Sequence, residues 1–178
     1  MICRRAKRYD ALPCCGSGQG GLFLRILVVS DTHRDRAALR RAVLAQPSAE
    51  VVIHLGDGAE EAEEMKLNFP EKMFLLVRGN CDWGSTLLPE AVAEFAGKRI
   101  FYTHGYTYNV KYGIYEAVSA ARRSKADVLL FGHTHVPLTE YRDGLFIMNP
   151  GSLNGSCGTY GILDLTPAGI VTNIVKAD

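Results

Sequence analysis

Side chains that can bind metal ions occur in five short motifs of this 178-residue chain. Aspartate, asparagine and histidine supply the candidate ligands, and the motifs hold four of the chain's five histidines. Imidazole and carboxylate ligands together suit zinc, iron or manganese better than calcium or magnesium. The sequence therefore predicts a transition-metal centre. In chain order, the motifs are Asp31-Thr32-His33, Gly56-Asp57, Gly79-Asn80-Cys81-Asp82, His104-Gly105 and Gly132-His133-Thr134-His135.

All five motifs follow apolar segments that are typical of buried strands. In two motifs the ligands are two residues apart, and residues i and i+2 that leave a strand project to the same side. Each motif alone is short enough to occur often by chance. Open α/β sheets, however, bind ligands beyond the carboxyl ends of their strands, where all five motifs fall. The shared position favours one common site over scattered structural residues.

Asp57 and Asn80 are the single candidate ligands of their motifs. Asp57 lies between two glycines that let the backbone approach a ligand closely, and its carboxylate can bridge two cations. Asn80 offers a neutral amide oxygen to a metal ion and keeps an NH2 donor for phosphate. His54, in contrast, lies within an apolar run and has no partner at ligand spacing. We expect His54 to pack in the core or to support the site from behind.

The elements that must position the motifs alternate in the first half of the chain. Apolar runs predict strands at 24–30, 51–55 and 73–78, and the intervening segments predict helices at 35–46 and 59–68. Such βαβ repetition implies parallel strands.

The second half of the chain contains turn signals that are typical of hairpins, at residues 96–98, 142–144 and 167–169. A helix over 111–124 is predicted from the spacing of its apolar residues. Two sheets flanked by helices form the economical assembly, which is an α/β fold.

Composition limits the classes of protein that fit. With 47% hydrophobic residues and a net charge of +1, the chain can bury one sizeable core, so we expect a single domain over 24–178. No stretch approaches the roughly 20 apolar residues of a membrane span, and the core carries no strong basic run. Membrane insertion and general nucleic-acid binding are therefore not indicated. The odd number of cysteines favours a reducing compartment, and we expect a cytoplasmic protein.

Residues 1–23 differ from the rest of the chain. They begin with a basic segment, continue with glycine, serine and cysteine, and lack the apolar core of a secretory signal. We expect either a disordered tail or translation from an upstream start that the cell does not use.

The ordered motifs resemble those of the calcineurin-like metallophosphoesterase superfamily. The short length and the Gly-Asn-Cys-Asp variant at 79–82 are similar to the small YfcE-like phosphodiesterases of bacteria and archaea, a group that also resembles the small scaffold subunit of retromer. The resemblance covers residues 24–176. It implies two mixed β-sheets sandwiched between helical layers, which periodicity alone would not establish.

The resemblance also implies a two-metal hydrolase and its site residues. Two divalent ions in such sites lie about 3.5–4 Å apart and produce a hydroxide that attacks phosphorus in line. The implied cofactors are two divalent ions, with manganese preferred and zinc, iron and nickel as alternatives, and the implied partner is a small phosphodiester substrate. Catalytic roles fall to Asp57, Asn80 and His104. By this resemblance Asp31, His33 and His135 hold one ion, Asn80, His104 and His133 hold the other, and Asp57 bridges them.

Cys81 departs from the wider superfamily, in which many members have a histidine after the motif asparagine as a candidate proton donor. A thiol with a pKa near its usual ~8.5 is a poorer acid for a leaving alkoxide. We therefore expect slow turnover of poor leaving groups and faster cleavage of aryl diesters. A packing role for Cys81 is the alternative. Asp82 is expected to orient a neighbouring ligand.

Two further segments lie near the motifs. Five tyrosines between positions 102 and 115 surround His104 in sequence, and we favour packing over substrate contact for them. The segment Asn149-Pro150-Gly151-Ser152 is expected to support the metal-binding loops through backbone and hydroxyl contacts.

Alternatives to a phosphodiesterase stay open. One is a protein-interaction scaffold on the same fold with an idle site, and another is a phosphomonoesterase or nuclease that uses the same site. Every motif position retains a side chain that can bind metal, which favours catalysis. The sequence is also compatible with a homo-oligomer.

Overall fold

The computed structural model describes residues 23–177. The tail expected over 1–23 lies outside the described residues except for Phe23. Strands and helices follow in the order β1 (Leu24–Val29), α1 (Arg36–Ala45), β2 (Ala49–His54), α2 (Ala59–Asn68), β3 (Met73–Leu76), β4 (Glu90–Phe95), β5 (Lys98–Thr103), a 3-10 helix (Tyr106–Tyr108), α3 (Tyr115–Arg123), β6 (Val128–Phe131), β7 (Leu138–Arg142), β8 (Leu145–Asn149), β9 (Thr159–Thr166) and β10 (Gly169–Lys176).

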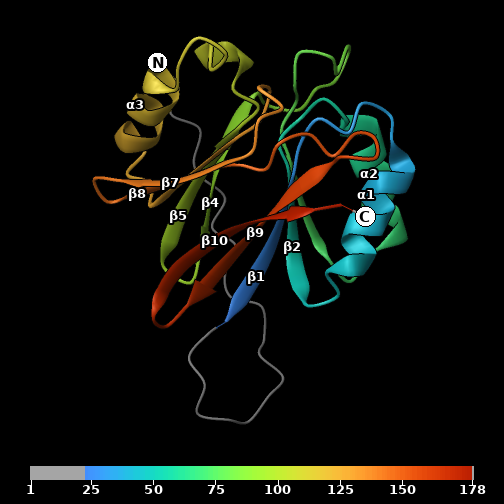
Figure 1. Cartoon of the computed structure of the whole chain (residues 1–178), viewed down its shortest axis with the longest axis horizontal. Coiled ribbons are helices and arrows are strands. Elements are labelled where there is room, and N and C mark those ends of the chain that lie inside the picture. Colours follow the sequence, from blue (N-terminus) through green and yellow to red (C-terminus); the bar gives the residue numbers. More distant parts are fainter. Residues whose placement is uncertain (1–22, 178) are drawn as a thin grey trace.

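Two five-stranded mixed sheets form the centre of the fold (Figure 1). The first has the order β10-β9-β1-β2-β3, with β1, β2 and β3 parallel and β9 antiparallel to β1. The second has the order β4-β5-β6-β8-β7, with β5, β6 and β8 parallel. Helices α1 and α2 cover the first sheet, and α3 packs on the second. The predicted α/β architecture of two mixed sheets between helical layers is confirmed.

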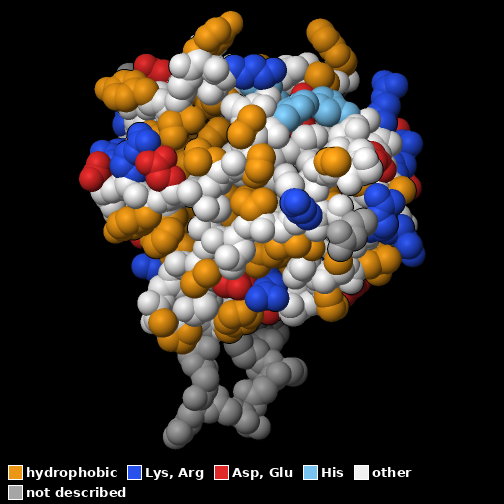
Figure 2. Space-filling view, in the orientation of Figure 1, with side chains coloured by type: hydrophobic (Ala, Val, Ile, Leu, Met, Phe, Trp, Pro, Cys, Tyr) orange, Lys and Arg blue, Asp and Glu red, His pale blue; other side chains and the backbone are white. Residues whose placement is uncertain are grey.

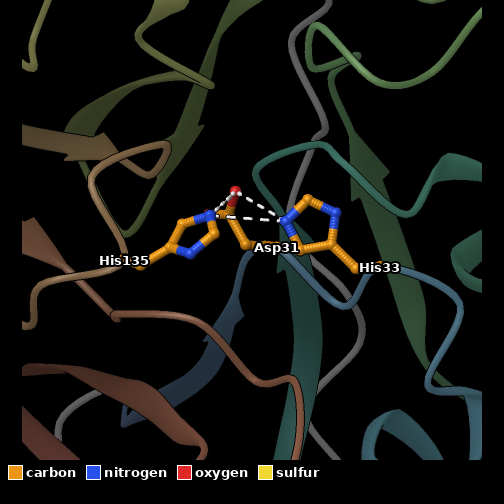
Figure 3. Close-up of side chains that lie close together, drawn as sticks. All are labelled: Asp31, His33 and His135. Carbon is orange, nitrogen blue, oxygen red and sulfur yellow. Dashed lines mark hydrogen bonds and ion pairs between the residues drawn. The ribbon is translucent and has the colours of Figure 1, made fainter.

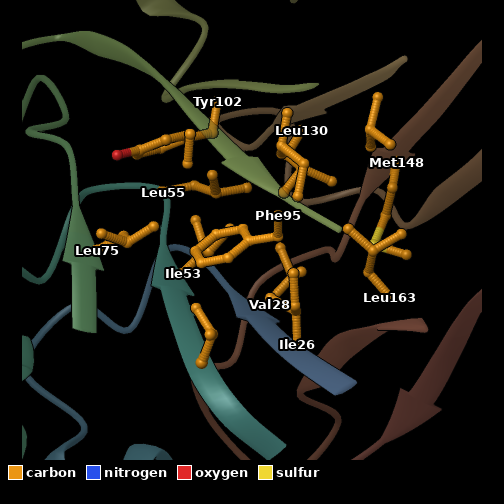
Figure 4. Packing of buried hydrophobic residues seen from close by; sticks show 14 of the residues in the cluster. Ile26, Val28, Ile53, Leu55, Leu75, Phe95, Tyr102, Leu130, Met148 and Leu163 are labelled. Carbon is orange, nitrogen blue, oxygen red and sulfur yellow. The ribbon is translucent and has the colours of Figure 1, made fainter. Parts of the chain in front are cut away.

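Strand β1 is buried on both of its faces, as its continuous apolar run indicates. Ile26 and Val28 point into the core between the sheets, where residues such as Leu130 of β6 meet them (Figure 4). Leu27 and Val29 point the other way and belong to the cluster beneath α1 and α2. This packing fixes the end of β1, and hence the start of the first motif.

Local signals account for several boundaries. Helix α2 has the predicted bounds, and α1 begins at Arg36 because the Asp35 side chain accepts a 2.9 Å hydrogen bond from the N–H of Ala38. Three hairpins occur at the predicted turns. In the first turn Ala96 and Gly97 both have positive φ, which matches the twist of the flanking strands.

The helix predicted over 111–124 is shorter in the structure, where α3 spans Tyr115–Arg123. Gly113 has a φ of 148°, which is incompatible with a helix, so residues 111–113 form a turn. Strand β3 also ends at Leu76, two residues before the predicted end. No helix among residues 23–177 is long and apolar enough to cross a membrane.

Candidate metal centre

The loops after β1, β2, β3, β5 and β6 meet at one edge of the two sheets. A 2.8 Å hydrogen bond from Nδ1 of His104, after β5, to the carbonyl of Leu55, after β2, ties the sheets together there. All seven predicted metal ligands lie at this edge. Figure 2 shows histidine side chains gathered at the surface near the top of the view. Ligand atoms of Asp31, His33 and His135 form one group within 4.8 Å of one another, and those of Asp57, His104 and His133 form a second.

In the first group, Oδ1 of Asp31 faces two imidazole rings (Figure 3). Nε2 of His135 lies 3.1 Å from this oxygen, Nε2 of His33 lies 3.8 Å from it, and the two nitrogens are 3.3 Å apart. The other oxygen, Oδ2, accepts hydrogen bonds from the Ser30 hydroxyl and from the N–H of His133. One carboxylate oxygen is thus held by the protein, and the other is directed toward the imidazoles.

In the second group, Nε2 of His104 is the central atom. It lies 3.1 Å from Nδ1 of His133, 3.2 Å from Oδ1 of Asn80 and 3.5 Å from Oδ2 of Asp57. The Asn80 oxygen therefore lies beside this group, with which the resemblance associates it. His33 also lies close to Asp57, within a third group that adds Cys81, so the two ligand sets are contiguous and Asp57 lies between them.

The surroundings of His104 suit a cation. Its Nδ1 faces a carbonyl oxygen, which only accepts, so Nδ1 carries a proton, and in the neutral ring Nε2 has a lone pair. This lone pair meets two more acceptors, the oxygens of Asn80 and Asp57. With a neutral His104 ring these acceptors converge without a donor, and a divalent cation would satisfy all of them. The donor set of imidazole, carboxylate and amide suits first-row transition metals.

Burial keeps the imidazole of His133 unprotonated and available for a metal ion. Its pKa is lowered, first by burial and then by the nearby His104 and Lys111. A neutral ring is the form that binds metals.

Backbone conformation at the site is unusual. Asp31, His33, Asp57, His133 and His135 all have φ between 44° and 68°, the left-handed region that non-glycine residues seldom adopt. Each such residue costs roughly 1–3 kcal/mol and persists only where the surroundings hold it. Concentration of this strain in five of the seven predicted ligands indicates that the fold positions these side chains for function.

Glycines let the loops approach closely enough to form the site. A Cβ atom on Gly79 would lie 2.0 Å from Oδ1 of Asp57 and 2.5 Å from its backbone nitrogen. A Cβ on Gly132 would lie 2.0 Å from Oγ of Ser30. The glycines of the G-D, G-N-C-D and G-H-T-H motifs are therefore required by contact between loops from different strands.

Asp82 joins two of the ligand loops. Its Oδ2 accepts hydrogen bonds from the N–H groups of Asp57 and Gly79, and its Oδ1 accepts from those of Gly58 and Ala59, all at 2.7–2.9 Å. Burial raises the pKa of this carboxyl, but the four backbone hydrogen bonds outweigh it and lower the pKa overall. This arrangement agrees with the expectation that Asp82 orients a neighbouring ligand.

His54 lies beneath the site in a buried hydrogen-bonded chain. Its Nδ1 accepts from the N–H of Gly56, its Nε2 lies 3.2 Å from the Thr32 hydroxyl, and that hydroxyl donates to Glu61. Glu61 also accepts from the backbone N–H of Arg34. His54 is fully buried and hydrogen-bonded to the loop after β2, which fits both the packing and the supporting role expected of it. Glu61 was not recognised from the sequence, because its partners lie 27 and 29 residues away.

The segment after β8 supports the loops, as predicted. The Asn149 side chain donates to the carbonyl of Gly132 and to the hydroxyl of Thr134, within the H-x-H loop. The Ser152 hydroxyl donates to the carbonyl of Asp31. Asn154, which the sequence did not single out, donates to the carbonyl of Thr32.

Cys81 is exposed and lies beside Asp57 and His33. Its Sγ accepts a 3.2 Å hydrogen bond from Asn80, which fixes the orientation of the Asn80 amide. Although the residue is exposed, partial burial of its thiol, together with the neighbouring Asp57 carboxylate, raises the pKa of Cys81 to about 11. The thiol is consequently protonated at neutral pH and can donate a proton. A purely buried packing role does not fit its exposure.

The tyrosines around His104 differ in their surroundings. Tyr102 is buried in β5, as expected for packing, and Tyr112 is exposed. The Tyr106 ring lies 5.8 Å from the His104 ring. Packing therefore describes only part of this group.

A cavity of about 740 Å³ opens beside Asp57 and His33. Its walls are the first turn of α2 and the loop that follows β3. Apart from His33 and Asp57, the lining residues are Arg34, Gly58, Ala59, Glu60, Glu61, Glu63, Cys81, Asp82, Trp83, Gly84, Ser85, Thr86 and Leu87.

The calcineurin-like phosphoesterase superfamily domain matches residues 24–167, a span that includes all five motifs. The chain belongs to this superfamily. Phosphodiesterase YfcE of Escherichia coli (strain K12) is 29% identical over 178 residues, which cover 80% of this chain and 88% of YfcE. The probable metallophosphoesterase YsnB of Bacillus subtilis is 28% identical over 131 residues, covering 73% of this chain and 75% of YsnB. The predicted resemblance to the YfcE-like group is confirmed.

Two further relatives bear on the fold and on alternative functions. Vacuolar protein sorting-associated protein 29 of Schizosaccharomyces pombe is 31% identical over 145 residues, covering 78% of this chain and 77% of that protein. The crystal structure of a conserved uncharacterized protein, a predicted phosphoesterase from Streptococcus pneumoniae, matches with a TM-score of 0.76 at 22% identity, covering 88% and 91% of the two chains. This structural likeness supports the fold.

Proposed function

We propose that this metallophosphoesterase-family protein hydrolyses a small phosphodiester with the help of two divalent metal ions, manganese being the preferred ion. The observation that carries the proposal is the convergence of acceptor atoms from Asp57, Asn80 and His104, which a divalent cation would satisfy together. Similarity to the phosphodiesterase YfcE supports the choice of reaction.

The ligand sets proposed from the sequence are kept. Asp31, His33 and His135 would hold one ion, Asn80, His104 and His133 the other, with Asp57 shared between them. Bound ions would supply Lewis acidity to the phosphoryl group and lower the pKa of a coordinated water.

The chain's own groups have distinct tasks. The Asn80 amide, held by Cys81, places its oxygen toward His104. The hydrogen bond that Nδ1–H of His104 donates to the Leu55 carbonyl fixes the ring orientation. Cys81 carries a proton at neutral pH and lines the cavity beside Asp57, where a departing alkoxide would need one.

The cavity supports a small diester over a polynucleotide. Four carboxylates besides Asp57 line it, at positions 60, 61, 63 and 82, against one cationic side chain, Arg34. Arg36 and Lys66 pair with Glu60 and Glu63, so the wall is not strongly negative, but it offers no row of cationic side chains for a polynucleotide backbone. A small diester needs only the single charge at its phosphoryl group to be attracted by the metal ions.

A protein-interaction scaffold is the second candidate, favoured by the similarity to vacuolar protein sorting-associated protein 29. In that case the site would be idle. The complete ligand set and its strained backbone weigh toward catalysis, since strain without a ligand brings no benefit to a scaffold.

Hydrolysis by metal-stripped protein tests the proposal. Bis(p-nitrophenyl) phosphate and p-nitrophenyl phosphate would be compared with and without added manganese. We expect manganese-dependent cleavage that favours the diester and falls at least ~100-fold in Asp57→Asn. Asp164→Asn is a matched control, because Asp164 pairs with Arg25 away from the site. Absence of hydrolysis of both esters despite bound metal would contradict the proposal and favour the protein-interaction scaffold.

A further inference from the structure

We propose that Trp83 is a specificity-determining residue whose indole stacks against a planar aromatic group on one arm of the phosphodiester. This inference rests on the proposed function, since the phosphoryl group must lie at the metal centre. Trp83 lines the same cavity as Asp57 and His33, so one ligand can contact the indole and the candidate metal ligands together.

The backbone of Trp83 is anchored firmly. Its neighbour Asp82 is held by four backbone N–H groups from both ligand loops. The N–H of Trp83 donates to the carbonyl of Cys81, and that of Ser85 donates to the carbonyl of Asp82, which closes a turn. This turn fixes the position of the Trp83 Cα atom relative to Asp57.

The side chain of Trp83, in contrast, is left without contacts of its own. It is 91% exposed and makes no hydrogen bond, ion pair or ring contact with another described residue. Single exposed apolar residues are ordinary on protein surfaces. Trp83 differs because it is the chain's only tryptophan and stands on the wall of the cavity beside the metal centre. An anchored backbone with an uncovered aromatic face suits stacking.

Charge in the cavity narrows the class of ligand. Glu60 and Glu63 belong to the same wall, and Arg34 is the one cationic side chain among the lining residues. Arg36 and Lys66 pair with these two carboxylates from outside the wall, which leaves Arg34 as the one lining side chain that could pair with a further anionic group. We therefore expect the arm that enters to carry no negative charge of its own. A neutral aryl group or an uncharged nucleobase satisfies this requirement and supplies the face that an indole stacks on.

Competitive inhibition of diester hydrolysis by unreactive analogues measures how tightly the arm binds, without a contribution from the chemical step. Phenylphosphonate and methylphosphonate have the same unreactive head group, and only one has an aromatic arm. We expect wild-type protein to bind phenylphosphonate about tenfold more tightly, within the range of aromatic stacking. Trp83→Ala should abolish this preference without changing the methylphosphonate constant, and Trp83→Phe should restore part of it.

Tyr115→Ala serves as the matched control, because Tyr115 is an exposed aromatic residue on α3 that does not line the cavity. The Tyr115→Ala variant should prefer phenylphosphonate over methylphosphonate to the same extent as the wild type. The competing location for an aromatic arm is Tyr106, whose ring lies near His104. A preference that survives in Trp83→Ala and disappears in Tyr106→Ala would overturn the assignment.

Fluorescence of the single tryptophan gives a readout that does not depend on turnover. Phenylphosphonate should change the emission of metal-loaded protein saturably, and methylphosphonate should leave it nearly unchanged. A thymidine phosphonate distinguishes the sources of the arm, because tighter binding than phenylphosphonate indicates a nucleoside. Equal, small responses to all three compounds would overturn the inference. Absence of manganese-dependent diester cleavage would instead overturn the proposed function, and the fluorescence result would still decide the role of Trp83.

Discussion

The carboxylate of Asp82 accepts a 2.9 Å hydrogen bond from the backbone N–H of Asp57, the residue placed between the two ligand groups. Three more N–H groups bind the same carboxylate, so it holds the G-D and G-N-C-D loops at a fixed separation. Precise placement of ligands in a metal centre depends on such contacts behind them.

Replacement of Asp82 with asparagine should weaken metal binding. The amide keeps one acceptor oxygen and turns an NH2 group toward N–H donors, so about half of the contacts are lost. We expect manganese affinity to fall roughly 10–100-fold, as measured by isothermal titration calorimetry. Asp143→Asn, in the exposed β7–β8 turn, should leave it unchanged. An unaltered manganese affinity in Asp82→Asn would show that the loops hold their positions without the hydrogen bonds to the Asp82 carboxylate.

A methyl group at Gly79 should separate the two ligand loops. Its Cβ would lie 2.0 Å from Oδ1 of Asp57, and the contact with the Asp57 backbone leaves no room for adjustment. We expect Gly79→Ala to destabilise the fold by about 1–3 kcal/mol and to reduce metal affinity. Urea unfolding and metal titration measure the two effects.

Gly155→Ala separates crowding from backbone strain. Gly155 has a positive φ, but nothing lies within 4 Å of the added Cβ. This variant should cost about 1 kcal/mol and retain metal affinity. Equal loss of affinity in both variants would remove the steric explanation.

His54 should make stability depend on pH. Burial lowers its pKa below the usual ~6.5, and the ring accepts from the Gly56 N–H, so protonation would oppose that contact. Above pH ~6.5 both states are neutral and the contribution is fully present. As the pH falls further, the unfolded state takes up a proton that the folded state does not, so stability is lost until the folded pKa is reached.

The variant His54→Asn keeps an acceptor near Gly56 but does not titrate. In metal-free protein, the slope of the unfolding free energy against pH below 6.5 should become shallower by up to about 1.4 kcal/mol per pH unit. Chemical denaturation at pH 5 to 7.5 gives this slope. An identical slope in both proteins would mean that His54 is protonated in the folded state.

Local patterns sufficed for much of the fold and for the choice of candidate ligands. Ligand type and strand-end position are both visible in short segments, as in Asp31-x-His33 after its apolar run. The left-handed backbone at Asp31 and Asp57 was not predicted, because loop contacts impose it and the residue types do not. Glu61 and Asn154 were missed for a similar reason: their partners belong to distant segments. The helix predicted over 111–124 was wrong in its first residues, because the φ of Gly113 depends on the turn around it.

Exchange of Cys81 for histidine should change which leaving groups are tolerated. The thiol, with a pKa of about 11, is a weaker proton donor than an imidazolium. The wild type should therefore cleave diesters with alkyl leaving groups most slowly. We expect Cys81→His to raise kcat/KM for alkyl diesters about tenfold relative to aryl diesters. A series of diesters with graded leaving-group pKa values would measure this. An unchanged dependence on leaving group would exclude Cys81 as the proton donor.

The number of divalent ions bound per chain tests the central claim most directly. Native mass spectrometry of manganese-loaded protein should show two ions in the wild type. His135→Ala should keep one of them, because only the Asp31 group loses a ligand, and Asp57→Asn should weaken both, because Asp57 lies between the groups. One ion or none in the wild type, or two firmly held ions in Asp57→Asn, would contradict a shared two-metal centre.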